Sequence, residues 1–562
     1  MTNVRGRAAL LAVGLSGVLL VGACGSGSGS GNSKPKAAPP GVSAVNVNAQ
    51  PREKVKDGGR LTLSIQQWIA QYNSYQVDGT QGDGAWITSL VEPNLWRADA
   101  KGVGHVNPDV LISAKVTASA PHQVVTYEIN PKAIWSDNTP VTYKDFLALW
   151  TALNGKNSAY LAASNSGYNQ ITGVARGKDD REVKVTFGTS YGDWHSLFDP
   201  LVPAKAISTP TEFNKGWLQK APITGGPWKF GTLDKTDQTI TLVPDPHYWG
   251  DKPKLSQLIL RALDADAYTE SYLNKEIDLA PARLPDAYKR LSKAKDTDIR
   301  SGSRWDESMV LLSNKGALSD LKVRQAVEMA INRDAVAKVN SQGLPFQLKA
   351  IGNHFLMPNQ AGYKDNSGIY GKFNPDQAKK LLDQAGWKDN GQGKARTKSG
   401  KQLNLQWVIS SGSPTDTAEL VKSMLSQVGI NVVIQTVPAN DFFEKYVNVG
   451  KFDLAPVRSV DAIYPSTLIS GFMQPSATNQ NGNPGGIGSA AIDALLTQAS
   501  QATDPAQALD LYNKADAAIW EIGNSIPLYQ TPQIDAVRHG LANYGASGLQ
   551  SESQEVNTGW QK

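Results

Sequence analysis

The chain has one cysteine, Cys24, in 562 residues. This excludes an intramolecular disulfide and a zinc site built from cysteines, so packing of apolar side chains must hold the fold together. The length allows about two to four domains. The composition, 40% apolar and 19% charged, is typical of a soluble globular protein rather than a disordered or multi-span membrane protein. We therefore expect several large cores without covalent cross-links.

The N-terminus has the pattern of a secretory signal, with two arginines before a nearly unbroken apolar run over residues 8–21. The run is shorter than the about 20 residues of a transmembrane helix. It ends in VGAC at 21–24, which resembles a bacterial lipobox; the alternative is a cleaved signal with an incidental cysteine. The Gly/Ser-rich and Pro/Ala-rich stretch that follows favours a lipid anchor, because it would form a flexible tether. We predict a lipoprotein signal peptide at 1–23, lipidation of Cys24 and a tether over 24–57.

Several classes of function lack their sequence signatures. The formal net charge of +5 is too small to indicate a nucleic-acid partner. There is no GxxxxGK[ST] loop, no GxSxG motif and no HExxH motif, and the six histidines are widely scattered. We therefore expect a protein that is not an enzyme and has neither metal nor cofactor, although a secreted hydrolase without these signatures stays open.

From Gly58 onward, strand-like and helix-like patches alternate, which favours a mixed α/β or α+β fold. Apolar side chains recur at helical spacing in 319–331, 374–385 and 414–428, and Gly429 follows the third of these. The clearest strands are 61–65, 124–129, 183–187 and 240–243.

Four segments, in order between about residues 58 and 530, carry a resemblance. They are the strand, turn and helix from Tyr127 to Phe146, in which Asn138 replaces a glycine; TGGPW at 224–228; LKVRQAVEMAINRD at 321–334; and GKFDL at 450–454, followed by Asp461 and Pro465. Together they resemble the solute-binding proteins of ABC importers, specifically the oligopeptide- and dipeptide-binding lipoproteins of bacterial extracellular solute-binding protein family 5.

The resemblance implies a two-lobed, periplasmic-binding-protein-like fold with an extra inserted domain. Lobe I would comprise 58–95, 216–305 and 525–562, the inserted domain 96–215, and lobe II 306–524. The lobes would close over a ligand by hinge motion, and the closed form would dock on the permease.

The resemblance also implies ligand-binding residues. Asp461 matches the carboxylate that holds the terminal amine of a peptide, and Arg458 stands where the family often has a tryptophan and would favour an acidic ligand group. Trp68, Tyr160 and Tyr168 are candidates for stacking on ligand side chains. The alternatives are a solvated loop carboxylate for Asp461, a salt-bridged or surface arginine for Arg458, and core packing for the three aromatic residues.

The sequence thus predicts an extracytoplasmic, lipid-anchored, monomeric component of an ABC importer that captures peptides and delivers them to the permease subunits. Its only link to the membrane would be the lipid. Within the same fold the ligand could instead be a nickel chelate, an opine or an oligosaccharide, since fold does not determine function. A surface lipoprotein that does not serve transport is a further alternative.

Overall fold

The computed structural model describes residues 45–562, apart from positions 100–101, 412, 414, 439–440, 461–462, 476–481 and 549–553. The signal peptide, Cys24 and Asp461 lie outside the described residues. No helix in the described part is long and apolar enough to cross a membrane.

The folded part begins earlier than the sequence predicts. Residues 46–57, assigned above to the tether, lie along the C-terminal segment: Asn46 forms a β-bridge with Ala546, and Val55 forms one with Gln561. The side chain of Val55 is fully buried. The tether predicted over 24–57 therefore does not extend to residue 57, because this apolar side chain is part of the folded body.

Lobe I contains a four-stranded sheet of order β1-β10-β9-β8, in which β1 and β10 are parallel and the other pairs antiparallel. In β1, Leu61, Leu63 and Ile65 are buried, as the alternation of a half-buried strand requires. The predicted strands 61–65 and 240–243 are confirmed. The bounds are β1 (Arg60–Ile65), β8 (Trp228–Asp234), β9 (Thr239–Pro244) and β10 (Gln257–Ala262).

The inserted domain contains an antiparallel sheet of order β4-β5-β7-β6 and the helix α2 (Tyr143–Leu153). Thr142 and Asp145 form a capping box at the start of α2. Asn138 has a φ of +65°, so it takes the left-handed conformation of the glycine that it replaces. The strands are β4 (Leu111–Ala118), β5 (Val124–Ile129), β6 (Ile171–Arg176) and β7 (Glu182–Phe187). One apolar core runs through this domain and lobe I.

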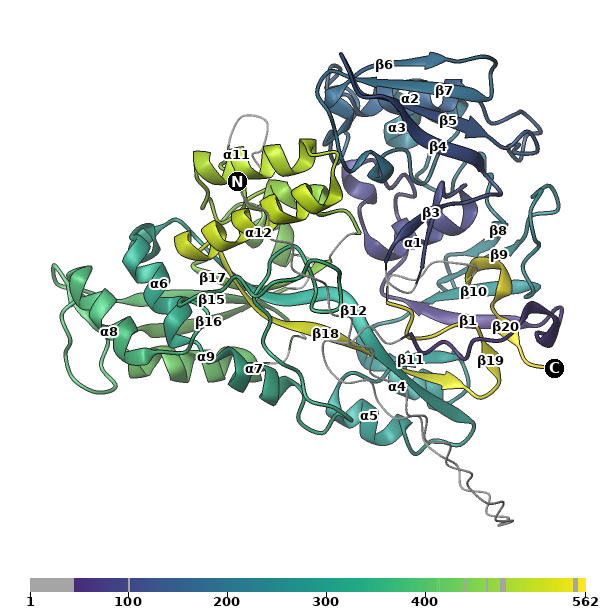
Figure 1. Ribbon diagram of the computed structural model, residues 1–562. Coiled ribbons are helices and arrows are strands. Elements are labelled where there is room, and N and C mark those ends of the chain that lie inside the picture. The colour runs from purple at the N-terminus through teal and green to yellow at the C-terminus, as the bar shows by residue number, and fades with distance from the viewer. Residues whose placement is uncertain are drawn as a thin grey trace, which may run out of the picture. The chain divides into compact units, whose positions relative to one another are not determined.

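Two long antiparallel strands, β12 (Thr297–Leu312) and β18 (Ser525–Arg538), pair along most of their length (Figure 1). They lie in a six-stranded sheet of order β11-β18-β12-β17-β15-β16. β11 (Leu279–Pro281) pairs with the C-terminal end of β18, whereas β17 (Leu454–Val460) pairs with the C-terminal half of β12. The predicted boundary between lobes I and II at residues 305 and 306 thus falls inside a continuous strand.

In lobe II, helices pack against the β17-β15-β16 end of this sheet and form a second apolar core with it. The three predicted helices are confirmed as α6 (Leu321–Ala330), α8 (Pro375–Gln384) and α9 (Asp416–Gln427). Asn374 caps α8 by accepting from the Gln377 N–H, and Gly429 has a φ of +84° after α9. The neighbouring elements are α7 (Arg333–Asn340), β15 (Asn404–Ser410), β16 (Asn431–Val437), α11 (Ala490–Gln501) and α12 (Pro505–Ile522).

The remaining elements are short. They are α1 (Gly82–Val91), β2 (Trp96–Ala98), β3 (Gly104–Val106), α3 (Pro210–Lys215), α4 (Tyr268–Leu273), α5 (Pro285–Leu291), β13 (Thr397–Lys398), β14 (Lys401–Gln402), β19 (Leu541–Ala542), α13 (Gln554–Asn557) and β20 (Gly559–Trp560). Single 3-10 turns and one π-helical turn, Phe442–Val447, connect them.

Candidate ligand-binding site

Charged side chains gather where β12 and β17 lie side by side. Asp306 is only 2% exposed, and its two carboxylate oxygens lie 3.1 Å from the Arg304 Nε and 3.0 Å from the Arg458 Nε. In the strand register Ser308 stands opposite Arg458, so Arg458 is the diagonal neighbour of Asp306 on the same face. Burial raises the pKa of the Asp306 carboxyl, and the arginines act in the opposite direction.

Arg458, one of the residues predicted to bind ligand, is thus salt-bridged, with 37% of its side chain exposed. The pairing is one of the alternatives given above, but it leaves part of the Arg458 side chain accessible. Asp461, predicted three residues further on, cannot be placed beside it, because Asp461 lies outside the described residues. Its binding of a peptide amine stays a prediction.

A third arginine, Arg283, follows β11 and lies at the same sheet. The Ala282 N–H donates to the Ile534 carbonyl over 2.7 Å, which holds this segment against β18. Burial lowers the pKa of Arg283, and the positive charges of Arg458 and Arg304 lower it further. Within the described part of the chain, the Arg283 side chain makes no hydrogen bond or ion pair. We call Arg283, Arg304 and Arg458 the guanidinium cluster.

Two amide side chains lie beside the guanidinium cluster with unused hydrogen-bonding groups. The Gln530 Nε2 donates to the backbone carbonyl of Arg304 over 2.7 Å and to the Asn359 Oδ1 over 3.0 Å. The Gln530 Oε1 and the Asn359 Nδ2 are buried and have no partner among the described residues. One acceptor and one donor are therefore available next to the backbone of Arg304.

The structure places the two predicted stacking tyrosines in the core. Tyr160 is 8% exposed, and its hydroxyl donates to the Ser208 carbonyl over 3.1 Å. Tyr168 is 6% exposed, and its hydroxyl accepts from the Phe198 N–H over 2.7 Å. Both side chains are held by packing and by backbone partners, which favours the alternative of core packing; contact of Tyr160 and Tyr168 with a ligand stays a prediction. Trp68 is only partly buried against the same core, so its role stays a prediction.

Residues 190–193 of the inserted domain contact lobe II directly. The Gly192 N–H donates to the Ser500 carbonyl over 2.7 Å, and the Ser190 hydroxyl donates to the Gln501 carbonyl over 2.8 Å. The Ser466 N–H donates to the Asp193 Oδ2 over 3.1 Å, and the Tyr191 and Ser466 hydroxyls lie 3.1 Å apart. We call residues 190–193, Ser466 and 500–502 the closing contact, because these hydrogen bonds join two parts of the protein that are separate in sequence.

An aromatic contact extends the closing contact. Tyr464 of lobe II stacks on His195 of the inserted domain, with ring centroids 6.1 Å apart and an interplanar angle of 12°. Trp194 and Trp96 cover other sides of the His195 ring, at 3.6 and 4.7 Å between centroids. Burial lowers the pKa of His195 to about 4, so the ring is neutral at neutral pH.

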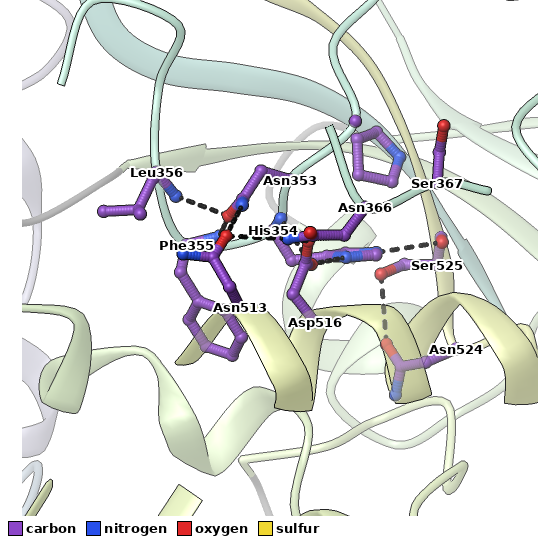
Figure 2. A network of polar contacts seen from close by, with 12 residues as sticks. Asn353, His354, Phe355, Leu356, Asn366, Ser367, Asn513, Asp516, Asn524 and Ser525 are labelled. Atoms are coloured by element: carbon purple, nitrogen blue, oxygen red, sulfur yellow. Dashed lines mark hydrogen bonds and ion pairs between the residues drawn. The ribbon is translucent and has the colours of Figure 1, made fainter. Parts of the chain in front are cut away.

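A buried polar network in lobe II is a further cluster of titratable groups (Figure 2). The His354 Nδ1 lies 2.6 Å from the Asp516 Oδ1, and the His354 Nε2 lies 3.1 Å from the Ser525 carbonyl oxygen. The Asn366 Nδ2 donates to the other Asp516 oxygen over 2.7 Å. The His354 and Asp516 side chains are both 0% exposed. Because these groups have partners and no access to solvent, the network joins α12 to β18 and is not a ligand site.

The sequence did not single out Arg283, Arg304 or Asp306. Arg304 and Asp306 are two residues apart in a strand-like run, a spacing that places both side chains on one face. That spacing indicates that Arg304 and Asp306 are neighbours, but it does not show that Asp306 is buried. Nothing in the sequence around Arg283 connects it with residues at 304 and 458. In the described part of the chain, no three histidine, cysteine, aspartate or glutamate side chains are arranged to hold a metal ion.

Comparisons with known proteins place this chain in a family. The model of the bacterial extracellular solute-binding proteins, family 5, matches residues 106–483. The chain is 34% identical to the oligopeptide-binding protein OppA of Mycobacterium tuberculosis. The alignment has 510 residues and spans 90% of this chain and 85% of that protein.

Solved structures show the same fold. The periplasmic EDTA-binding protein EppA matches with a TM-score of 0.84 and 23% identity, covering 93% of this chain and 99% of that one. The oligopeptide-binding protein AppA of Bacillus subtilis, in complex with a nonapeptide, matches with a TM-score of 0.76 and 21% identity, covering 91% and 100%. The resemblance seen in the four segments is confirmed, and the chain belongs to the bacterial extracellular solute-binding proteins of family 5.

Proposed function

We propose that this protein captures peptides outside the cytoplasmic membrane and delivers them to the permease of an ABC importer. The observation that carries the proposal is the 34% identity to an oligopeptide-binding protein over 90% of the chain. A lipid on Cys24 holds the protein at the membrane, and the residues between Cys24 and the folded body act as the tether.

Binding of a peptide requires partners for its backbone and its charged ends. Strand-like hydrogen bonding with the protein backbone satisfies the N–H and C=O groups of the peptide, whatever its side chains are. The terminal ammonium needs a carboxylate, because burying it unpaired costs several kcal/mol. Asp461 supplies this carboxylate, and Trp68 contributes an aromatic surface for a ligand side chain.

Closure of the lobes follows from the connection between them. β12 and β18 run from one lobe into the other, and their register shifts between Ser303 and Glu307 and again between Ser308 and Met309. Such irregularities interrupt the regular ladder and allow a strand pair to bend. We assign the hinge to this region and the closed form to the state in which the closing contact is made.

The test of peptide binding combines two changes at one interaction. Asp461→Asn removes the charge that balances the ammonium and should weaken binding by about 2–5 kcal/mol. N-acetylation of the peptide should weaken binding to the wild type similarly but cost the variant much less, because both changes remove the same ion pair. Calorimetric titration of free and acetylated peptides against both proteins measures this. Additive losses, or no loss, would remove Asp461 from the site.

The identity of the ligand is tested separately. Native mass spectrometry of the protein purified from its own host should detect co-purified peptides. A non-peptide solute in that spectrum, together with no binding of a peptide library in calorimetry, would refute peptide capture.

The anchor is tested by Cys24→Ala. The variant should appear in the medium or the soluble fraction, and the lipid mass should be absent from its N-terminal fragment. A variant that stays as firmly bound to the membrane as the parent would refute the lipid anchor.

A further inference from the structure

Within the described residues, Arg283 is a partly buried cation that pairs with no carboxylate, although Asp306 and Asp535 lie close enough to act on its charge. Arg304 and Arg458 share the carboxylate of Asp306, at 3.1 and 3.0 Å. Arg283 makes no ion pair or hydrogen bond within the described residues, and its strongest charged neighbours are Arg458 and Arg304. Removing a charge from water without a partner costs several kcal/mol, so an arrangement of this kind is stabilised when an anion is added.

The carboxylates near the cluster do not balance it. Asp535 lies on β18 and accepts a hydrogen bond from the Gln533 Nε2 over 2.9 Å, and burial raises the pKa of Asp535 to about 6. Glu307 follows Asp306 in a stretch of regular pairing with β17, so its side chain points to the opposite face of the sheet. The cluster therefore has three positive charges against two carboxylates, those of Asp306 and Asp535.

We propose that the guanidinium cluster binds a carboxylate of the ligand, with Arg283 forming the new ion pair, and that the transported peptides are acidic. The peptide part of this proposal rests on the proposed function. An arginine matches a carboxylate in geometry as well as charge, because its planar fork donates two parallel hydrogen bonds. The unused Gln530 Oε1 and Asn359 Nδ2 provide an acceptor and a donor for the amide groups next to that carboxylate.

The position of the acidic side chain in the peptide also follows. Arg458 is three residues before Asp461, which we assign to the terminal amine. Three residues of chain span at most about 10 Å. If Asp461 holds the terminal amine as proposed, the carboxylate that the cluster binds therefore belongs to one of the first residues of the peptide. A peptide that carries its acidic group only at a distant C-terminus should gain little from the cluster.

The experiment uses the mature protein and two series of alanine tetrapeptides. One series has a single Glu at positions 1 to 4 in turn, and the other has Gln at the same positions. Wild-type protein should prefer Glu over Gln at least tenfold at one or more of the first positions, and this preference should weaken as salt is raised. Arg283→Gln should abolish the preference, whereas Arg283→Lys, which keeps the charge, should retain part of it.

Arg290→Gln is the matched control. Arg290 lies on α5, seven residues after Arg283, and pairs with Glu270 at 2.6 Å in a surface ion pair whose side chains are 49% and 59% exposed. Its replacement changes the protein charge by the same amount at a nearby place outside the cluster. The preference for Glu should therefore stay as in the wild type.

Thermal unfolding of the ligand-free protein separates binding from a structural role. Replacing an arginine that stabilises the fold through a salt bridge would lower the unfolding temperature. Because Arg283 makes no ion pair or hydrogen bond within the described residues and lies beside two like charges, Arg283→Gln should leave the unfolding temperature of the ligand-free protein unchanged or raise it. The same substitution should reduce the increase in unfolding temperature that a Glu peptide causes.

The outcomes distinguish the two proposals. Equal binding of Glu and Gln peptides by the wild type, or an undiminished Glu preference in Arg283→Gln, would overturn the acidic-ligand inference and leave peptide capture standing. Binding of the tricarboxylate tricarballylate without binding of any tetrapeptide, and with loss in Arg283→Gln, would support the carboxylate site and refute peptide capture.

Discussion

Replacing Gly192 with alanine should weaken ligand binding about thirtyfold without unfolding the protein. A β-carbon at this residue would overlap the backbone carbonyl oxygen of Ala502, at the end of α11. A backbone carbonyl cannot turn aside like a flexible side chain. The variant must therefore hold the inserted domain away from lobe II at the closing contact.

The size of the effect follows from the hydrogen bonds at that point. Two of them come from residues next to the new methyl group: Gly192 N–H to the Ser500 carbonyl, at 2.7 Å, and the Ser190 hydroxyl to the Gln501 carbonyl, at 2.8 Å. Each intramolecular hydrogen bond contributes about 0.5–1.5 kcal/mol net, so losing both costs about 2 kcal/mol. If ligand is held in the closed form, that cost is subtracted from the binding free energy and corresponds to about thirtyfold in Kd.

The assay is calorimetric titration of one peptide against the wild type, Gly192→Ala and a control. Gly173→Ala is the matched control, because Gly173 lies in β6 of the same domain and a β-carbon there would meet no atom within 4 Å. The control should bind as the wild type does. An affinity of Gly192→Ala equal to that of the wild type would refute the assignment of these hydrogen bonds to the ligand-bound state.

Three further predictions concern stability and shape. Asp516→Asn should lower the free energy of unfolding by about 3–5 kcal/mol in denaturant titrations, because it leaves a buried histidine without its charged partner; Asp510→Asn, which breaks a surface pair with Lys514 on the same helix, should cost less than about 1 kcal/mol. Because burial lowers the pKa of His195 to about 4, the unfolded chain takes up its proton first as pH falls below the ordinary value of 6.5, so stability should fall. Between about pH 7 and pH 5 this loss should reach up to about 2 kcal/mol in denaturant melts, and His195→Gln should lack that contribution. Saturating peptide should reduce the radius of gyration in solution scattering, and superposable curves with and without peptide would argue against hinge closure.

Local structure could be predicted well from the sequence. The predicted strand at 124–129 has the bounds of β5, and the helix predicted after Asn374 begins at Pro375 with Asn374 as its cap. Asn138 and Gly429 both have left-handed conformations, which asparagine and glycine adopt more readily than other residues. In each case the determining interaction lies within a few residues along the chain, where spacing and side-chain chemistry suffice.

The candidate site could be predicted only in part. Arg458 was found from a motif, but its ion pair with Asp306 depends on the pairing of β12 with β17. Tyr160 and Tyr168 had the chemistry of ligand contacts, and only the packing of the inserted domain shows that they are buried. A motif identifies a position in a family, whereas burial depends on every element that packs against that position.

The sequence by itself thus determined the segments and the family, because helix caps, strand alternation and motifs are read from neighbouring residues. The tertiary structure alone decided that Arg283, Arg304 and Arg458 form one cluster and that residues 190–193 meet residues 500–502. These groups are separated by long stretches of chain, and the sheet order β11-β18-β12-β17 brings the arginines together. The physical reason is that electrostatic and hydrogen-bonding energies depend on distance in space, which local propensities along the chain do not specify.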